Sequence, residues 1–193
     1  MVLTPLFPMA LYDQPWRKYH GRGHITDVHC HIFHLQQVQG IEPVDYEALD
    51  YAVDLHDIIY VPGQPGSEEA SALMAASYGL TEAARLIRLT EKHQPEPDDA
   101  DGILIVNADL FGLGREYEHY RRNTVLIRQE ISAYLDRLPG TVLQSERKRR
   151  WVAGRSAWLT DFLSRDQIFY GPCMEKYEAR ARQNMEHELR SYS

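Results

Sequence analysis

The chain has 193 residues, of which 44% are hydrophobic and 25% are charged, and its formal net charge is −7. These are ordinary values for a globular protein, and the length suits a single domain. No apolar run approaches the roughly 20 residues that a membrane-spanning helix needs, and the acidic balance opposes general nucleic-acid binding. We therefore expect a protein whose partners include neither membranes nor nucleic acids.

Residues 1–24 are predicted to be an irregular lead-in, followed by one helix-rich domain over residues 25–193. Pro5 and Pro8 interrupt the apolar opening, and no basic segment precedes it, so the pattern does not favour a secretory signal. Two cysteines are too few for a disulfide framework, which suits a reducing compartment. We expect a cytoplasmic location.

Residues 25–33, with the sequence ITDVHCHIF, are predicted to form the first strand because they are rich in β-branched and aromatic residues. Alternate side chains of a strand share a face, so Asp27, His29 and His31 would point the same way and Cys30 would face the core. Two imidazoles at this spacing can bind one ion, either Zn²⁺ or another divalent metal. His29 and His31 are therefore the predicted metal ligands.

Residues 103–109 are predicted to form a second strand, parallel to the first, because a continuous apolar run is typical of a strand buried on both faces. The odd-numbered positions of this run become polar at Asn107 and Asp109, near the end where barrel enzymes place their chemistry. Asp109 is therefore the candidate catalytic residue. The alternative is that Asn107 and Asp109 only cap the following turn.

The other ordered segments are predicted to be helical. Apolar residues recur every three or four positions from Tyr120 to Leu138, Ser67 with the acids after it is a sound helix start, and the last segment is a highly charged helix. The remaining histidines are assigned to the lead-in, to a loop or to helix surfaces. The predicted helices cover residues 45–59, 67–92 (one helix, or a pair broken near Gly79), 120–138, 141–165 and 174–190. The histidines so assigned are His20 and His24 in the lead-in, His34 in a loop, and His56, His93, His119 and His187 on helices.

The stretch from Asp27 to Phe33, DVHCHIF, resembles the first-strand motif of the metal-dependent amidohydrolase superfamily, an aspartate-x-histidine-x-histidine sequence. The resemblance implies an α/β fold, the (β/α)₈ TIM-type barrel, with His29 and His31 as metal ligands. It also implies hydrolysis, in which a metal-activated water attacks an amide, ester or related bond of a small-molecule substrate. A related motif opens phosphoesterase domains of the polymerase and histidinol phosphatase type, so the bond that is broken stays open.

Length argues against a complete barrel, because eight strands and helices take at least about 200 residues. We therefore expect the N-terminal part of a barrel, a fragment with an incomplete site that binds metal weakly and has little activity alone. Its open sheet edges would favour association into a homo-oligomer. The alternative is a noncatalytic helical interaction protein that retains a vestigial metal motif.

Overall fold

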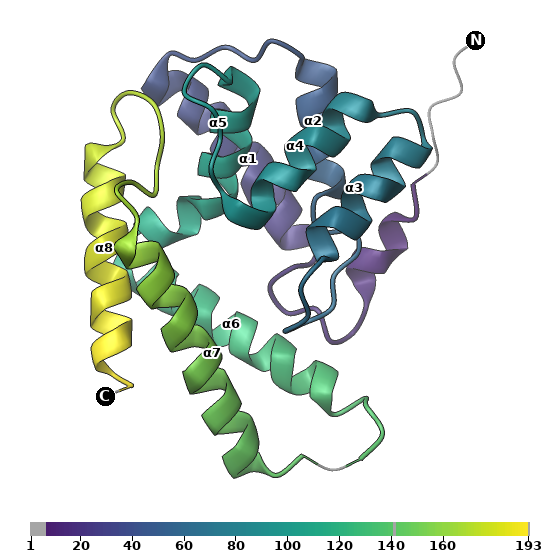
Figure 1. Cartoon of the computed structure of the whole chain (residues 1–193), viewed down its shortest axis with the longest axis vertical. Helices are drawn as coiled ribbons and strands as arrows, with labels where there is room; N and C mark the ends of the chain where they lie inside the picture. The colour runs from purple at the N-terminus through teal and green to yellow at the C-terminus, as the bar shows by residue number, and fades with distance from the viewer. Residues whose placement is uncertain (1–6, 141, 193) are drawn as a thin grey trace.

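The computed structural model describes residues 7–140 and 142–192, and this part of the chain consists of α-helices and two short 3-10 helices without any strand (Figure 1). The predicted α/β class, and with it the partial TIM-type barrel, is wrong. The argument that a barrel of this length must be incomplete no longer applies. None of the described helices is both long and apolar enough to span a membrane.

The helices expected after residue 45 are present, and the pair around Gly79 is two separate helices. The two segments that were expected to be strands lie inside the helices α1 and α5. The elements are η1 (Met9–Asp13), α1 (Arg22–Gln39), α2 (Tyr46–Leu55), α3 (Ser67–Ser77), α4 (Thr81–Lys92), α5 (Ala100–Leu110), η2 (Phe111–Gly114), α6 (Tyr117–Leu135), α7 (Gln144–Ser164) and α8 (Glu175–Arg190).

Helix α1 replaces the first predicted strand because its apolar pattern continues beyond residue 33. The buried residues Ile25, Val28, Ile32 and Leu35 are three or four positions apart, which is the spacing of one helix face. The helix ends at Gly40, whose φ of 64° is the left-handed conformation that suits glycine at a helix C-terminus. Over nine residues alone, the alternating pattern of a strand fits equally well.

Helix α5 replaces the second predicted strand. Its apolar run is buried on every side, and a continuous run of this length does not distinguish a buried strand from a buried helix. The local signal for a helix lies in the preceding acidic segment, where the Asp99 carboxylate accepts a hydrogen bond from the backbone N–H of Gly102 at 2.9 Å. This is the usual geometry of a helix N-cap.

Helices α1 to α5 form a body around one apolar core. Helix α5 packs against α1 and α4, and α2 packs against α4, so that α5 is central. Its residues Leu104, Ile105 and Val106 are completely buried. The lead-in also packs on this body, since Tyr12 is buried and its hydroxyl donates a hydrogen bond to the Asp54 carbonyl at 2.9 Å.

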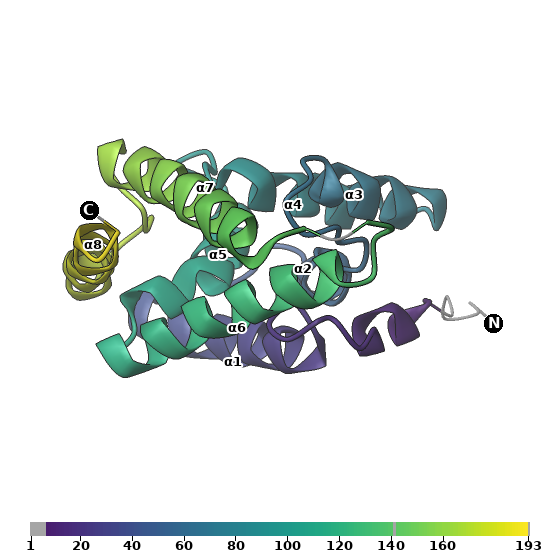
Figure 2. The same ribbon diagram turned by 90° about the horizontal axis from the view of Figure 1, so that it is seen from below.

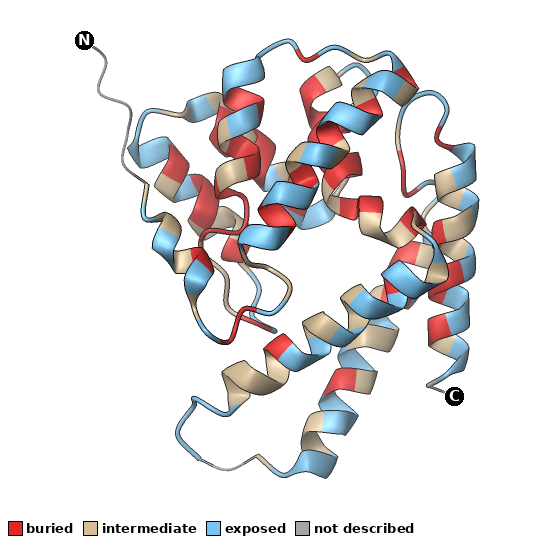
Figure 3. Ribbon diagram, turned by 180° about the vertical axis from the view of Figure 1, so that it is seen from behind, coloured by how far each residue is buried: buried red, intermediate tan, exposed pale blue. Residues whose placement is uncertain are grey.

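Helices α6 and α7, with the described residues between them up to 140 and from 142, project from the body as a pair that we call the arm (Figures 1 and 2). Helix α6 packs mainly against η2, and α7 packs against α8 at the edge of the molecule. Buried positions are dense in the body and sparse along the arm (Figure 3). The arm therefore contributes few residues to the apolar core.

Candidate metal centre

Four ionisable side chains from three helices of the body converge on one point. His24 lies in the first turn of α1, His56 and Asp57 follow the last turn of α2, and Asp109 is the penultimate residue of α5. His24, His56 and Asp57 are buried, with exposed fractions of 7%, 2% and 7%. The packing of α1, α2 and α5 around the core thus brings these residues together.

The donor atoms of His24, His56 and Asp57 have the spacing of ligands around a single ion, and an oxygen of Asp109 lies beside the two histidines. His24 Nε2 lies 3.3 Å from His56 Nε2, 3.6 Å from Asp57 Oδ2 and 3.1 Å from Asp109 Oδ1. His56 Nε2 lies 3.3 Å from Asp57 Oδ2 and 3.7 Å from Asp109 Oδ1. Neighbouring ligands that bind an ion at about 2.1 Å are roughly 3.0 to 3.4 Å apart. The buried group of His24, His56 and Asp57 could therefore hold a metal ion.

The tautomer of His56 suits metal binding. Its Nδ1 lies 2.8 Å from the backbone carbonyl of Val53, and only a protonated nitrogen can donate to this oxygen. In the neutral ring, the lone pair is then on Nε2, which faces the other three donors. A backbone carbonyl that fixes the ring in this way is the common outer partner of a metal-binding histidine.

The two carboxylates of the cluster require positive charge beside them. Burial alone would raise the pKa of Asp57, but the imidazoles of His56 and His20 outweigh it and hold this pKa well below its usual range. Burial would likewise raise the pKa of Asp109, but hydrogen bonds from His24 and His93 lower it. A bound divalent ion would place further positive charge beside both carboxylates.

Burial lowers the pKa of a histidine, whereas it raises the pKa of a carboxylate such as Asp57 or Asp109. Desolvation lowers the pKa of the His56 imidazole, but Asp57 and Asp109 outweigh it and raise the pKa to about 9. Metal binding at neutral pH would therefore release a proton from this ring, and the apparent affinity for the metal should fall as the pH falls.

Polar contacts outside the cluster hold its members in place. The guanidinium of Arg17 donates hydrogen bonds to the backbone carbonyls of Asp57 and Ile58 at 2.6 and 2.8 Å, which fixes the turn after α2. His93 Nε2 lies 2.9 Å from Asp109 Oδ2, so that His93 orients the carboxylate whose other oxygen faces the cluster. Such outer partners restrict the ligands to one geometry.

The cluster lies at one side of a cleft of about 750 Å³ between the body and the arm. Asp57 and Asp109 contribute to the body side of the cleft, together with His20 and His93. Helices α6 and α7 form the other side. A second hollow of about 950 Å³ lies between the ends of α4 and α7, and none of the cluster residues lines it.

The structure places the two predicted metal ligands outside this cluster. In a helix, His29 and His31 point about 200° apart. His29 lies on the surface beside Asp50 and Asp54, with Nε2 3.0 Å from Asp54 Oδ1. His31 Nδ1 lies 3.0 Å from the Ala108 carbonyl, and Cys30, which was expected in the core, is exposed. The strand parity that joined the two histidines in one site therefore does not hold.

Asp109, the predicted catalytic residue, belongs to the cluster, whereas His24, His56 and Asp57 were not recognised as site residues. The sequence contains a signal for these residues in two places. His24 precedes Ile25 on the buried face of α1, and His56 and Asp57 follow directly after the apolar face of α2. The signal at His24 depends on assigning residues 25–39 to a helix. No family model, curated protein or solved structure matches this chain.

Proposed function

We propose that this chain is a metal-dependent hydrolase of phosphate esters, in which His24, His56 and Asp57 hold one divalent ion and Asp109 lies beside it. The observation that carries the proposal is the spacing of the three ligands' donor atoms, 3.3 to 3.6 Å, beside a cleft large enough for a small molecule. Metal-bound water is the nucleophile in many hydrolases of this chemical type.

The number of protein ligands suits a catalytic rather than a closed structural site. Three side chains leave at least one position of the ion open for water. Two imidazole nitrogens and one carboxylate oxygen suit Zn²⁺, Mn²⁺ or Fe²⁺. Open positions would face the cleft, since both Asp57 and Asp109 contribute to its lining.

The charge of the arm favours an anionic substrate. Between Tyr117 and Ser164 the chain has nine arginines and lysines against five aspartates and glutamates, whereas the whole chain has 21 against 28. Arg147 and Arg150 of α7 line the cleft. A basic wall opposite a metal centre attracts and orients phosphate groups, while the acidic remainder of the chain repels large polyanions. A small phosphate ester therefore fits better than a neutral amide or a nucleic acid.

In the proposed reaction, a water oxygen bonds to phosphorus while the ester P–O bond breaks, and the departing alcohol takes up a proton. The ion would lower the pKa of the water and neutralise charge on the phosphate oxygens. The residues of the chain would hold the ion, and His93 would keep Asp109 oriented toward it. Both cysteines are exposed and unpaired, so the proposal includes a reducing, cytoplasmic setting.

The metal site is tested by calorimetric titration of the metal-free protein with Mn²⁺ and Zn²⁺. We expect one ion per chain, and a loss of affinity of at least about 100-fold in His24→Ala and Asp57→Asn, because even outer partners are worth about 10- to 100-fold. His29→Ala, on the same helix as His24 but outside the cluster, is the matched control and should bind normally. Equal binding by all four proteins would contradict the ligand assignment.

Activity is tested with p-nitrophenyl phosphate, bis-p-nitrophenyl phosphate and p-nitrophenyl acetate at saturating Mn²⁺. We expect metal-dependent release of nitrophenol from a phosphate ester, abolished by Asp57→Asn and retained by His29→Ala. Firm metal binding without hydrolysis of any ester would favour the alternative of a noncatalytic protein.

A further inference from the structure

The side of the arm that lines the cleft is largely apolar. Ile127, Ile131 and Tyr134 of α6 line the cleft, as do Trp151 and Trp158 of α7. Ile127, Ile131, Tyr134 and Trp158 are only half-buried. An amphipathic helix normally buries its apolar stripe against a neighbour, but here the cleft stands between α6 and the body.

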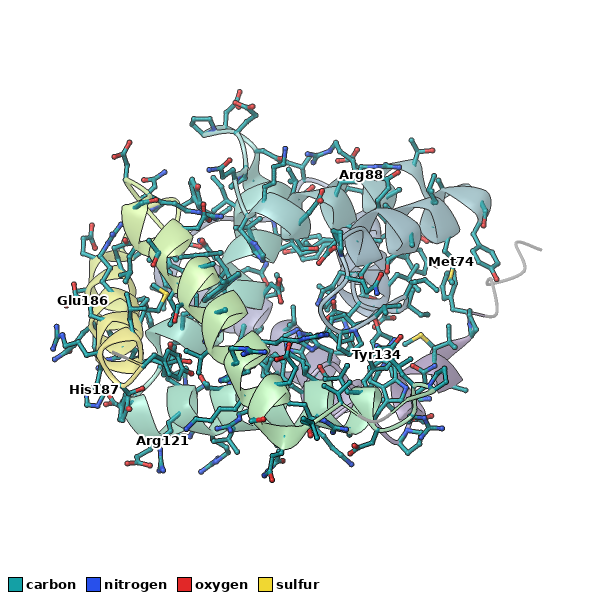
Figure 4. The ribbon with its side chains drawn as sticks, turned by 60° about the horizontal axis from the view of Figure 1, so that its bottom comes forward. Met74, Arg88, Arg121, Tyr134, Glu186 and His187 are labelled. Atoms are coloured by element: carbon teal, nitrogen blue, oxygen red, sulfur yellow. The ribbon has the colours of Figure 1, made fainter. Side chains whose placement is uncertain are left out.

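The orientation of the arm agrees with this description. Tyr134 lies on the side of α6 that faces the N-terminal segment, whereas Arg121 points away from the body (Figure 4). The ring of Tyr134 packs edge-on against Trp16 at 5.3 Å between centroids. At the far end of the cleft, the ring of Trp158 stacks on Phe162 at 4.2 Å. Rigid aromatic side chains thus lie at both ends of an isoleucine-lined wall.

The cleft arginines are already paired. Arg155 is held by Glu188, with contacts of 3.0 and 3.1 Å, and both side chains are at most 10% exposed. Arg147 contacts Asp136, and Arg150 lies 2.7 Å from Glu146. The arm keeps an excess of basic residues, but the arginines within the cleft are engaged, so the wall itself offers mainly hydrocarbon and aromatic surface.

A phosphate group alone would fill a small part of this volume. It would occupy the space beside Asp57 and Asp109, and the remainder of the 750 Å³ cleft would stay open toward Ile127 and Ile131. Pockets of a few hundred Å³ normally enclose a whole organic ligand, with apolar walls around its body and a few polar groups that fix its orientation. One ligand that reaches both parts must be polar at one end and apolar at the other.

We infer that the substrate is a phosphate monoester of a bulky apolar or aromatic alcohol, and that Ile127, Ile131 and Trp158 select for this group. The inference rests on the proposed function, because it assigns the phosphate to the metal centre. The apolar wall would hold the organic group, and the free energy of its burial would discriminate against small or polar alcohols. A single added carbon group in such a pocket typically changes specificity by tenfold or more.

The test compares 1-naphthyl phosphate, phenyl phosphate and glycerol 2-phosphate with the Mn²⁺-loaded full chain. The two aryl alcohols are of similar acidity, so that their difference reports on the fit of the organic group. We expect kcat/KM for the naphthyl ester to exceed that for the phenyl ester by at least tenfold, and the glycerol ester to be poorest. In Ile131→Ser the naphthyl preference should fall at least fivefold, with unchanged Mn²⁺ affinity.

Val125→Ser is the matched control, since Val125 lies on the same helix, is 44% exposed and does not line the cleft. It should keep the full naphthyl preference. Ile127→Ser is a second cleft variant in case Ile131→Ser folds poorly. Quenching of tryptophan fluorescence gives a readout without turnover, because Trp151 and Trp158 line the cleft: 1-naphthyl phosphate should bind more tightly than inorganic phosphate.

Three outcomes separate the two proposals. Hydrolysis of all three esters with equal kcat/KM, or an equal loss for all esters in Ile131→Ser, would overturn the assignment of the apolar wall and leave the hydrolase intact. Absence of hydrolysis together with tight naphthyl binding would contradict the hydrolase and keep the apolar site. A concentration-dependent dimer in light scattering that Ile131→Ser abolishes would show that a second copy covers the wall, and would overturn the inference.

Discussion

The body and the arm are stabilised by different kinds of interaction. In the body, buried aliphatic side chains from α1, α2, α4 and α5 form a continuous core. The arm contributes few residues to that core and is fixed instead by two buried carboxylates, Glu130 of α6 and Glu188 of α8. Apolar packing is nondirectional and needs close contact over a large area. A few charged hydrogen bonds can instead fix an element at single points, without a large packed surface.

This difference accounts for the position of the cleft. Glu130 accepts hydrogen bonds from the backbone N–H groups of Lys18, Tyr19 and His20 at 3.0 to 3.1 Å, and lies 2.6 Å from His20 Nδ1. Glu188 pairs with Arg155 and accepts a hydrogen bond from Tyr120. Because these anchors fix the arm, its apolar inner face need not pack against the body. The candidate metal centre lies on the body side of the resulting space.

The largest effect is expected for removal of the Glu130 anchor. In Glu130→Ala, three backbone N–H groups and the His20 imidazole lose their partner, and the loss of one member of a buried pair typically costs about 3 to 5 kcal/mol. Glu130→Gln should cost less because its amide oxygen still accepts hydrogen bonds. Urea denaturation measures both. Gln129→Ala, exposed on the same helix, is the control, and an equal loss in the two alanine variants would show that Glu130 is not an anchor.

The next comparison substitutes one aliphatic residue in each region. Leu104→Ala removes a fully buried side chain from the centre of the body and should cost about 2 to 5 kcal/mol of unfolding free energy. Ile131→Ala removes a half-buried side chain from the cleft wall and should cost less than about 1 kcal/mol, because water or ligand already contacts it. If the two losses were similar, the inner face of the arm would be part of the core after all.

A smaller effect is the pH dependence of stability that arises from His31 of α1, in the body. Burial lowers the pKa of His31 from 6.5 to about 4, although its hydrogen bond to Ala108 opposes this. Between pH 6.5 and 4 the unfolded chain therefore binds a proton at this position and the folded chain does not, so that stability falls as the pH falls. The loss attributable to His31 is at most about 3 kcal/mol. His31→Asn should flatten the pH dependence in this window, measured by urea midpoints at pH 7, 5.5 and 4.5, and an unchanged slope would contradict the assignment.

Much of the helical structure was accessible from the sequence. The spacing of apolar residues indicated α6, the apolar anchors Trp151, Trp158 and Phe162 indicated α7, and a highly charged segment indicated α8. The two errors in fold class have distinct causes. Residues 25–33 fit both an alternating and a helical pattern, and the decision depends on Leu35 and Gly40 further along. Residues 103–108 are buried and form a continuous apolar run, whose hydrophobic pattern has no periodicity that would distinguish a helix from a strand.

The candidate site was harder to predict because it is assembled in three dimensions from residues 24, 56, 57 and 109. Asp109 was selected because it lies at the polar end of a buried apolar run, and the structure places it beside His24 and His56. His24 and His56 were not selected, because the strand assigned to residues 25–33 left His24 in the lead-in. His29 and His31 were predicted as ligands from their spacing in a strand, but in helix α1 their side chains point to opposite sides.

The smallest effect is expected for an ion pair on the surface of the body. Arg88 of α4 and Glu69 of α3 form a bidentate pair, with contacts of 2.6 and 2.9 Å, and their side chains are 42% and 47% exposed. Arg155 and Glu188 have a similar bidentate geometry but are almost completely buried.

An exposed pair gains little because water and salt screen it, whereas a buried charge that loses its partner is left without solvation. Arg88→Ala should therefore shift the melting temperature by less than about 2 °C, and less still in high salt, while Arg155→Ala should lower it several times more. Equal shifts in thermal denaturation would mean that burial does not distinguish the two pairs and that the arm is not anchored through Glu188.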